Sequence, residues 1–187
     1  QQAAAAAQNS RLGTGGAAHR AGSRSAWVDH GHHALMRISA FQAVGGYDET
    51  FSHNEDAELD LRLAAGGFRI WLTTDVTIVY FPRDSAKALF RQYFNYGAGR
   101  ARTVRLHRTR LKVRQMLPLA VAPAVGLALL TPVFWPAALP ALAWAGLCLT
   151  YGGVIGHGPC AKLAGWPAMV MHMGWSIGFL RQWIRGQ

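Results

Sequence analysis

The longest uncharged segment constrains this chain more than any other feature. From Gln115 to Ala161 the sequence holds no Asp, Glu, Lys or Arg. A helix of about 20 apolar residues crosses the hydrocarbon core of a bilayer, so this segment is long enough for two. We expect spans at residues 116–135 and 137–155, joined tightly at Trp135 and Pro136. The sequence therefore predicts a membrane protein.

The net charge of +10 is a local feature that indicates the orientation of the spans. All nine acidic residues lie between Asp29 and Asp84, whereas ten of the nineteen basic residues lie between Arg83 and Arg114. Basic segments next to spans stay on the cytoplasmic side. We therefore expect residues 83–114, and the part of the chain before them, in the cytoplasm.

Residues 86–104 combine an apolar, aromatic stripe with basic flanks. This pattern is typical of an amphipathic helix that lies in the membrane interface and contacts anionic head groups. Nucleic-acid binding is the competing interpretation of basic and aromatic residues, and we reject it because the segment leads directly into a span. Residues 165–180 are a third apolar stretch, for which we expect an interfacial or re-entrant helix.

The cysteines and the start of the sequence give two further expectations. Cys148 and Cys160 fit neither a disulfide framework nor a zinc-site spacing, so we expect reduced thiols. The sequence begins at Gln1 without a charged segment or a cleavage pattern, and we expect no secretory signal. We expect the chain to be the C-terminal piece of a longer protein.

Four carboxylates lie within residues 54–60, where a loop leads into a helix. Glycines in residues 45–51 permit a turn before this cluster, and Gly66 and Gly67 can end a helix after it. The spacing predicts a helix from about 55 to 65. Ser52 and Glu55 have the spacing of a capping box at its start.

The faces of this helix follow from its periodicity. Asp56 and Asp60 share a face with Leu59 and Leu63, so we expect Asp56 to point inward near the helix start. A catalytic carboxylate and an ordinary acid favoured by the helix dipole are both compatible with this position. Glu58 and Arg62 have i, i+4 spacing on another face, where we expect an exposed ion pair.

The rest of the N-terminal part predicts an α/β pattern. We expect helices at residues 1–9 and 34–44 and strands at 68–72 and 76–80, which are too few strands to close a sheet. The glycine loop at 10–16 could contact phosphate or sugar oxygens, or it could be an ordinary turn.

Residues 27–33 form an extended segment in which His30 and His32 share one face. Both histidines could contact a metal, a phosphate or a sugar hydroxyl, and a metal site with His33 stays open. A plain surface strand that carries two histidines is just as compatible with the alternation.

Residues 45–51, followed by Asn54 to Leu59, resemble the acceptor-side signature of family 2 glycosyltransferases, in which a Gly-Gly-aromatic-acid segment leads into a Glu-Asp motif. Residues 12–16, 28–31, 80–83 and 91–97 resemble the branch that includes bacterial succinoglycan-type glucosyltransferases. The resemblance covers most of residues 10–115, and its specific part is the block from Gly45 to Leu59.

This resemblance implies an α/β fold, namely the C-terminal, acceptor-side half of a GT-A domain, followed by an amphipathic interface helix and transmembrane α-helices. It implies that Asp56 is the general base of an inverting transfer and that Glu55 orients the helix or contacts the acceptor. The remaining residues that it implies for acceptor binding are Gly15, Gly16, Asp29, His30, Tyr47, Arg83, Gln92, Tyr96 and Arg100.

The same resemblance implies the partners. The donor would be a nucleotide sugar, expected to be UDP-glucose, and the acceptor a saccharide on polyprenyl diphosphate in exopolysaccharide synthesis at the bacterial inner membrane. The Asp-x-Asp motif that holds Mg or Mn on the donor is absent from this chain, so this fragment should hold no metal itself. Gln92 is followed by Tyr93 rather than by the Gln-x-x-Arg-Trp pattern of processive members, which predicts addition of a single sugar.

The sequence thus predicts three parts: an acceptor-side catalytic half at 1–84, a basic interface segment at 85–115 and a membrane region of two or three helices at 116–187. One alternative stays open, a non-catalytic membrane module that binds anionic lipid or a partner enzyme through its basic segment. The two hypotheses differ in whether the function of the protein depends on Asp56.

Overall fold

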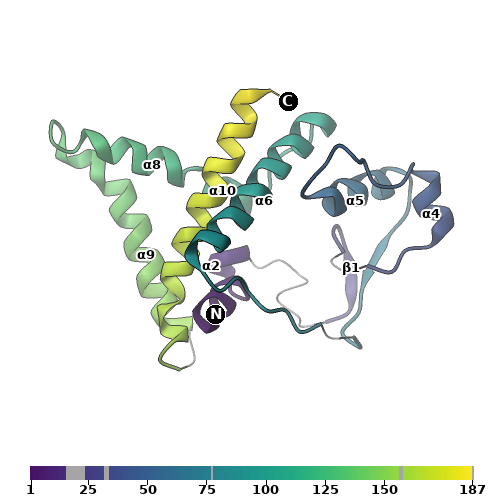
Figure 1. Ribbon diagram of the computed structural model, residues 1–187, viewed down its shortest axis with the longest axis horizontal. Helices are drawn as coiled ribbons and strands as arrows, with labels where there is room; N and C mark the ends of the chain where they lie inside the picture. Colours follow the sequence, from purple (N-terminus) through teal and green to yellow (C-terminus); the bar gives the residue numbers. More distant parts are fainter. Residues whose placement is uncertain (16–23, 32–33, 77, 156–157, 187) are drawn as a thin grey trace. The chain divides into compact units, whose positions relative to one another are not determined.

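The computed structural model of the chain describes residues 1–15, 24–31, 34–76, 78–155 and 158–186 (Figure 1). The chain divides into two compact units. We call Ala18–Val79 the small unit, and Gln1–Ala17 together with Tyr80–Gln187 the large unit. Each unit is described by itself.

The small unit contains one antiparallel pair of strands within its described residues. Strand β1 (Ala26–Val28) pairs with β2 (Ile70–Leu72), so that Trp27 lies opposite Trp71. The two indole rings meet edge to face, with centroids 4.9 Å apart. The predicted strand at 68–72 is therefore present in shorter form.

The prediction of a strand at 76–80 is wrong for its described residues, which have no regular structure. Ile78 and Val79 are exposed, although their residue types favour strands. A strand is stabilised by hydrogen bonds to a neighbouring strand, which local sequence does not reveal. Within the described residues the α/β prediction therefore holds only in part, because helices dominate.

Two helices of the small unit enclose its core. Helix α4 (Ile38–Ala43) and helix α5 (Glu55–Ala65) bring together Ala40, Leu59 and Leu63. The helix predicted at 55–65 is confirmed residue by residue, and the one predicted at 34–44 is shorter. The inward face predicted for Leu59 and Leu63 is also confirmed.

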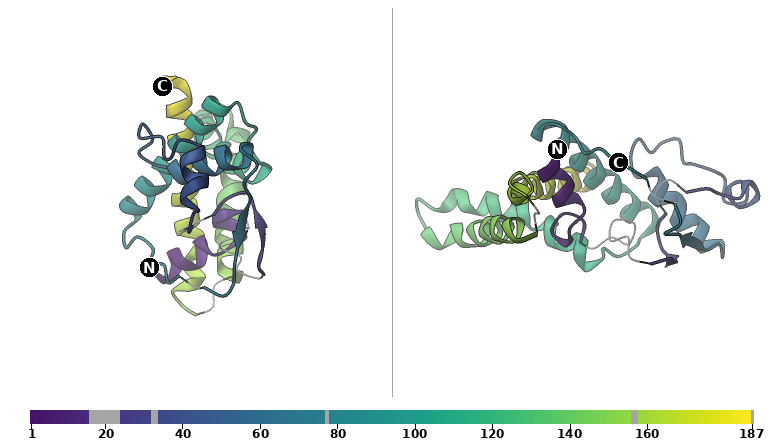
Figure 2. Two further views of the ribbon diagram at one scale, coloured as in Figure 1. Left: turned by 90° about the vertical axis from the view of Figure 1, so that its right-hand side faces the viewer. Right: turned by 90° about the horizontal axis from the view of Figure 1, so that it is seen from below.

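The large unit is built around two long helices that lie side by side, α6 (Ala86–His107) and α10 (Gly165–Arg185) (Figures 1 and 2). Helix α1 (Gln2–Gln8) and the short helix α2 (Arg11–Thr14) pack onto α10. The helix predicted at 1–9 is thus present, and it packs with the C-terminal helices. The shared core consists of Ala4, Ala7, Leu89, Tyr93, Ala164, Ala168 and Met171.

Glycines bring the backbones of α6 and α10 into contact. A β-carbon added to Gly97 would lie 2.1 Å from the carbonyl oxygen of Trp175, and one on Gly178 would lie 2.0 Å from that of Phe94. Gly174 meets the carbonyl of Phe90 in the same way. Small residues with this spacing allow helices to approach closely. Any larger side chain must push the two helices apart.

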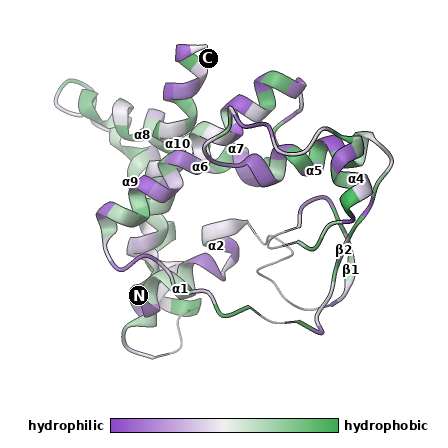
Figure 3. Cartoon of the chain, turned by 45° about the vertical axis from the view of Figure 1, so that its right-hand side comes forward, coloured by the Kyte–Doolittle hydropathy of each residue, from purple (hydrophilic) through white to green (hydrophobic). Residues whose placement is uncertain are grey.

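Two apolar segments of the large unit are long enough to cross a membrane. The first, Val113–Leu130, comprises α7 (Val113–Leu119), α8 (Val121–Leu127) and η1 (Ala128–Leu130). The second, Trp135–Ile155, comprises η2 (Trp135–Ala138) and α9 (Leu139–Ile155). Only 6% and 11% of these segments are buried, so most of their apolar residues are not covered by the rest of the chain. Figure 3 colours the chain by hydropathy and shows both segments as largely apolar. Two apolar helices were predicted, but the first ends at Leu130 and not at residue 135.

Helix α10 also stabilises the interruption between α7 and α8. Pro118 and Pro123 cannot donate backbone hydrogen bonds. The buried hydroxyl of Ser176 donates to the carbonyl of Leu119 (2.8 Å) and accepts from the N–H of Ala122 (3.0 Å). A polar side chain that meets displaced backbone groups is the usual way in which apolar helices tolerate proline.

His172 joins α10 to α2 and α9. The N–H of Trp144 donates to Nδ1 of His172 (3.2 Å), and Nε2 of His172 lies 2.7 Å from the carbonyl oxygen of Leu12. An indole N–H only donates and a carbonyl only accepts, so the ring is neutral with its proton on Nε2. Burial lowers the pKa of His172, and the hydrogen bond to Leu12 opposes part of this effect. His172, a polar residue within the third apolar stretch, thus forms a contact between helices. Helix η3 (Ala161–Ala164) leads directly into α10.

The close contact of α6 and α10 predicts how glycine substitutions affect stability. We expect Gly178→Ala to lower the free energy of unfolding by roughly 1–3 kcal/mol, because the new methyl group overlaps backbone atoms. Gly146→Ala in α9 is the matched control, because an added β-carbon there has no atom within 4 Å. The control should keep or raise stability by up to about 1 kcal/mol through helix propensity. Thermal unfolding of the detergent-solubilised protein measures both, and equal effects would contradict the packing.

Candidate active site

A double glycine ends α4 and directs the chain toward the acidic helix. Gly45 and Gly46 have φ values of 80° and 70°, in the left-handed region that other residues avoid. The N–H of Gly46 donates to the carbonyl of Phe41 (2.9 Å), which closes the helix in a Schellman-like turn. Tyr47 follows, exposed, with its ring edge-to-face against Phe41 at 5.4 Å. The turn therefore presents an aromatic side chain on the surface of the small unit.

Helix α5 begins without the predicted capping box. Asn54 is the N-cap, in a left-handed conformation with φ of 68°, and no side chain caps the helix. Asn tolerates this conformation better than most residues. Ser52 contacts His53 instead, with 3.1 Å between Oγ and Nδ1. The capping-box prediction is wrong because the helix starts two residues later than that motif requires, and Glu55 and Asp56 are its first two residues.

The Glu58–Arg62 pair is present but buried, so the prediction of an exposed pair is wrong. The guanidinium of Arg62 donates to both carboxylate oxygens of Glu58 at 2.7 and 2.6 Å, and a third N–H donates to the carbonyl of Val44. Glu58 is almost completely buried. Its hydrogen bond raises the pKa of Arg62, and desolvation opposes this in part. Periodicity missed this burial because residues before the helix cover a second face of α5.

A second buried carboxylate, Asp60, holds the segment that follows β1. Asp60 is 2% exposed, and its Oδ2 accepts from the backbone N–H of Gly31 at 3.0 Å. The same oxygen lies 2.6 Å from Nδ1 of His30. Sequence reasoning gave Asp60 no function. The sequence did contain a signal for a role of Asp60 beside Asp56, since Asp60 lies one helical turn after Asp56 on the face that also bears Leu59.

The structure places Asp56 and His30 together, two residues that the sequence proposed for the site. Oδ2 of Asp56 lies 3.9 Å from Nε2 of His30, and Oδ1 accepts from the N–H of Ala57 at 2.7 Å. The Asp56 side chain is 35% exposed. Glu55 is half-buried beside it, and Asp29 is exposed at the end of β1. Asp56 therefore combines access from solvent with fixed polar surroundings.

The other residues proposed for acceptor binding belong to the large unit. The amide nitrogen of Gln92 donates to the hydroxyl oxygens of Tyr80 and Tyr96, each at 2.9 Å. Arg83 is exposed before α6, and Arg100 is half-buried on it. Gly15 ends α2 with φ of 60°, whereas Gly16 lies outside the described residues. The large unit thus groups Gln92 with Tyr96 around Tyr80.

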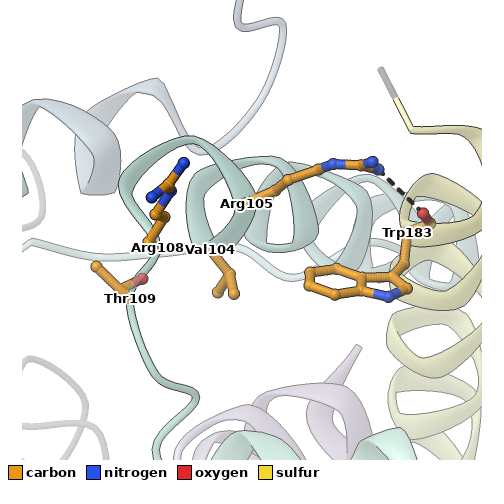
Figure 4. A pocket seen from close by; sticks show the side chains of 5 residues that line it. All are labelled: Val104, Arg105, Arg108, Thr109 and Trp183. Carbon is orange, nitrogen blue, oxygen red and sulfur yellow. Dashed lines mark hydrogen bonds between the residues drawn. The ribbon is translucent and has the colours of Figure 1, made fainter.

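A hollow of about 350 Å³ lies where the C-terminal ends of α6 and α10 meet (Figure 4). It is lined by Val104, Arg105, Arg108, Thr109 and Trp183. Arg105 reaches across it and donates to the carbonyl of Trp183 at 3.2 Å. Cations near helix C-termini interact favourably with the last carbonyls. Arg105 therefore serves first as a link between the two helices.

The described residues do not form a metal site. In this part of the chain no three His, Cys, Asp or Glu side chains are grouped to hold an ion. His30 is engaged by Asp60, while His32 and His33 lie outside the described residues. The described side chains therefore do not fit the divalent metal, which the family resemblance assigns to the donor-binding half.

Comparison with known proteins places these features in a family. A family model described as "Glycosyl transferase family group 2" matches residues 14–156, which include β1, the double glycine, α5 and α6. The chain belongs to the family 2 glycosyltransferases. The expected resemblance is thereby confirmed.

A curated relative narrows the likeness within this family. The chain is 56% identical over 185 residues to "Succinoglycan biosynthesis protein ExoA" of Rhizobium meliloti (strain 1021). The match covers 97% of this chain and 56% of the relative, so the chain spans about half of that protein's length. No solved structure matches the chain.

The buried ion pair of this family 2 glycosyltransferase predicts a large loss of stability when one partner is removed. Arg62→Met leaves Glu58 buried without its cation, which should cost about 3–5 kcal/mol of unfolding free energy. The double variant Glu58→Gln with Arg62→Met should recover part of this loss. Arg37→Met, on an exposed arginine, is the control and should stay within about 0.5 kcal/mol. Thermal unfolding measures all three, and a single Arg62 variant as stable as the control would refute the pair's importance.

Proposed function

We propose that the complete protein is an inverting glycosyltransferase of exopolysaccharide synthesis. It transfers glucose from UDP-glucose to a saccharide carried on polyprenyl diphosphate, and this chain supplies the acceptor side. Membership in family 2 and the name of the succinoglycan relative support the class of reaction. The choice of donor and acceptor follows from the resemblance to the succinoglycan branch.

The single observation that carries the proposal is the position of Asp56. It lies on the second residue of α5, partly exposed, with Oδ2 facing His30. A general base must reach the proton it removes. In the proposed step the acceptor hydroxyl oxygen attacks the anomeric carbon as its proton passes to Asp56. The bond from that carbon to the nucleotide diphosphate breaks on the opposite side, which inverts the configuration.

The helix start suits this role. The N-terminus of α5 carries a partial positive charge that favours the ionised form of a carboxylate, and only the ionised form can accept a proton. Glu55, in the preceding position, would orient the helix or contact the acceptor. Tyr47 offers an exposed ring against which a sugar could stack.

The donor is proposed to bind to a part of the complete protein outside this chain. An Asp-x-Asp motif there would hold Mg or Mn on the nucleotide diphosphate, and the metal would neutralise charge on the leaving group. The residues described here do not fit a metal, so their proposed roles are limited to the acceptor and its proton. The absence of a Gln-x-x-Arg-Trp pattern after α5 supports transfer of a single sugar.

We also propose that the catalytic part faces the cytoplasm at the inner membrane. The basic residues of α6 and of the segment after it precede the first candidate span, as the positive-inside rule requires. Helix α10 packs along α6, which supports a hairpin of the two apolar segments with both helices on the same side of the membrane. An interface position for this helix pair would bring the basic side chains to the acceptor's phosphates.

This topology predicts the behaviour of reporter fusions. Green fluorescent protein fused after Gln187 should fluoresce, whereas alkaline phosphatase at the same place should stay inactive, because that end lies in the cytoplasm. Alkaline phosphatase inserted after Val133, in the turn between the two candidate spans, should be active. Reporter activity in whole cells measures each fusion, and an active phosphatase at the C-terminus would refute the hairpin.

The proposed base predicts that Asp56→Asn abolishes transfer in the full-length protein. We expect kcat to fall by roughly 10²–10⁴-fold, because the amide cannot accept the proton. Asp75→Asn, on an exposed aspartate of the same unit, is the matched control and should leave transfer unchanged. Incorporation of labelled glucose into lipid-linked saccharide measures both. Retained turnover in a folded Asp56→Asn protein would remove Asp56 from the role of base.

Two further observations separate the catalytic proposal from a non-catalytic membrane module, namely liposome binding and the sequence of the gene upstream. Such a module would bind anionic liposomes in a salt-sensitive way through its basic segment, independently of Asp56. The gene upstream should encode a nucleotide-binding half with an Asp-x-Asp motif if the catalytic proposal is right. Its absence would favour the module.

A further inference from the structure

A chain of three side chains leads from the interior of the small unit to the proposed base. Asp60, buried on α5, contacts Nδ1 of His30 at 2.6 Å. The other ring nitrogen, Nε2, lies 3.9 Å from Oδ2 of Asp56. Asp56 and Asp60 are one helical turn apart, so a single imidazole can face both carboxylates at once.

The hydrogen bonds of Asp60 determine how the imidazole is held. The backbone N–H of Gly31 can only donate, so Oδ2 of Asp60 acts as an acceptor. An ionised carboxylate accepts from Nδ1 as well, which places a proton on that nitrogen. The ring is thereby fixed with Nε2 toward Asp56. A buried carboxylate that orients a histidine beside a reactive group is a recurrent catalytic arrangement.

We propose that His30, held by Asp60, is the positioning residue of the Asp56 base. In the imidazolium form, in which Nδ1–H donates to Asp60, the Nε2–H donates to Oδ2 of Asp56 after a small side-chain rotation that shortens the 3.9 Å separation. The N–H of Ala57 already holds Oδ1 at 2.7 Å. The carboxylate is then oriented from two sides while its exposed part meets the acceptor hydroxyl. This inference rests on the proposed function of Asp56.

The arrangement differs from the acceptor contact that the sequence alone suggested for His30. A histidine engaged by Asp60 through Nδ1 and facing Asp56 through Nε2 acts on the base, and through it on the acceptor. The competing explanation is purely structural: His30 and Gly31 tie the end of β1 to α5. The two explanations assign the function of His30 to different ring nitrogens.

Two amide variants separate these nitrogens. The amide nitrogen of Gln can occupy the position of Nε2, whereas that of Asn can occupy the position of Nδ1. In the full-length protein we expect His30→Asn to lower kcat about 10²-fold with little change in the KM for the acceptor, because the base is misplaced. His30→Gln should keep kcat within about tenfold of wild type, because it restores a donor toward Asp56. If His30 only anchors the segment, a folded His30→Asn protein keeps its kcat, and that result overturns the proposal.

Asp56→Asn in the same assay distinguishes the failure of this inference from the failure of the proposed function. If the Asp56→Asn protein is active, Asp56 is not the base, and the proposed function and the positioning role of His30 are both wrong. If the Asp56→Asn protein is inactive and the His30→Asn protein is fully active, Asp56 remains the proposed base and only the positioning role of His30 is wrong.

A spectroscopic measurement keeps the proposal testable if His30→Asn does not fold. In ¹⁵N-histidine-labelled full-length protein, we expect Asp56→Ala to shift the Nε2 resonance of His30 and to leave its Nδ1 resonance in place. His172, which contacts Trp144 and Leu12, serves as the internal reference. An Nε2 resonance of His30 that does not respond to Asp56→Ala overturns the proposal.

Discussion

Burial of two carboxylates on α5 is the constraint on which the small unit depends. A charged group removed from water costs several kcal/mol unless it is paired and hydrogen-bonded. Glu58 meets this requirement through Arg62, which also binds the carbonyl of Val44. Asp60 meets it through His30 and Gly31. The segment at His30 and Gly31 and the residue Val44 are thereby tied to different faces of α5. Asp56 is left partly exposed at the start of this helix.

The large unit depends on a different constraint, the close approach of two backbones. Glycines at positions 97, 174 and 178 leave no room for a β-carbon between α6 and α10. Because α10 also holds the break between α7 and α8 through Ser176, the apolar segments are joined to the basic helix by packing as well as by sequence. In the proposed function, this arrangement would keep the acceptor-binding surface at the membrane.

Local signals predicted the helices well and failed where distant segments decide. The helix at 55–65 follows from its apolar spacing and from Gly66 and Gly67, which are all local. The strand at 76–80 is absent from the described residues because a strand requires a partner. Glu58 was expected on the surface because periodicity identifies one apolar face and cannot show that a turn covers another. Asp60 lies on the predicted inward face, but its role was missed because its partners, His30 and Gly31, come from a distant segment.

The sequence by itself determined the family, the apolar segments and the identity of Asp56 as the candidate base. These features are carried by contiguous motifs and by composition, which need no knowledge of distant contacts. Only the tertiary structure decided that Glu58 is buried, that His30 lies between Asp60 and Asp56, and that α10 packs along α6. Each of these depends on which residues far apart in the chain become neighbours, because burial and hydrogen bonding are properties of the folded surroundings.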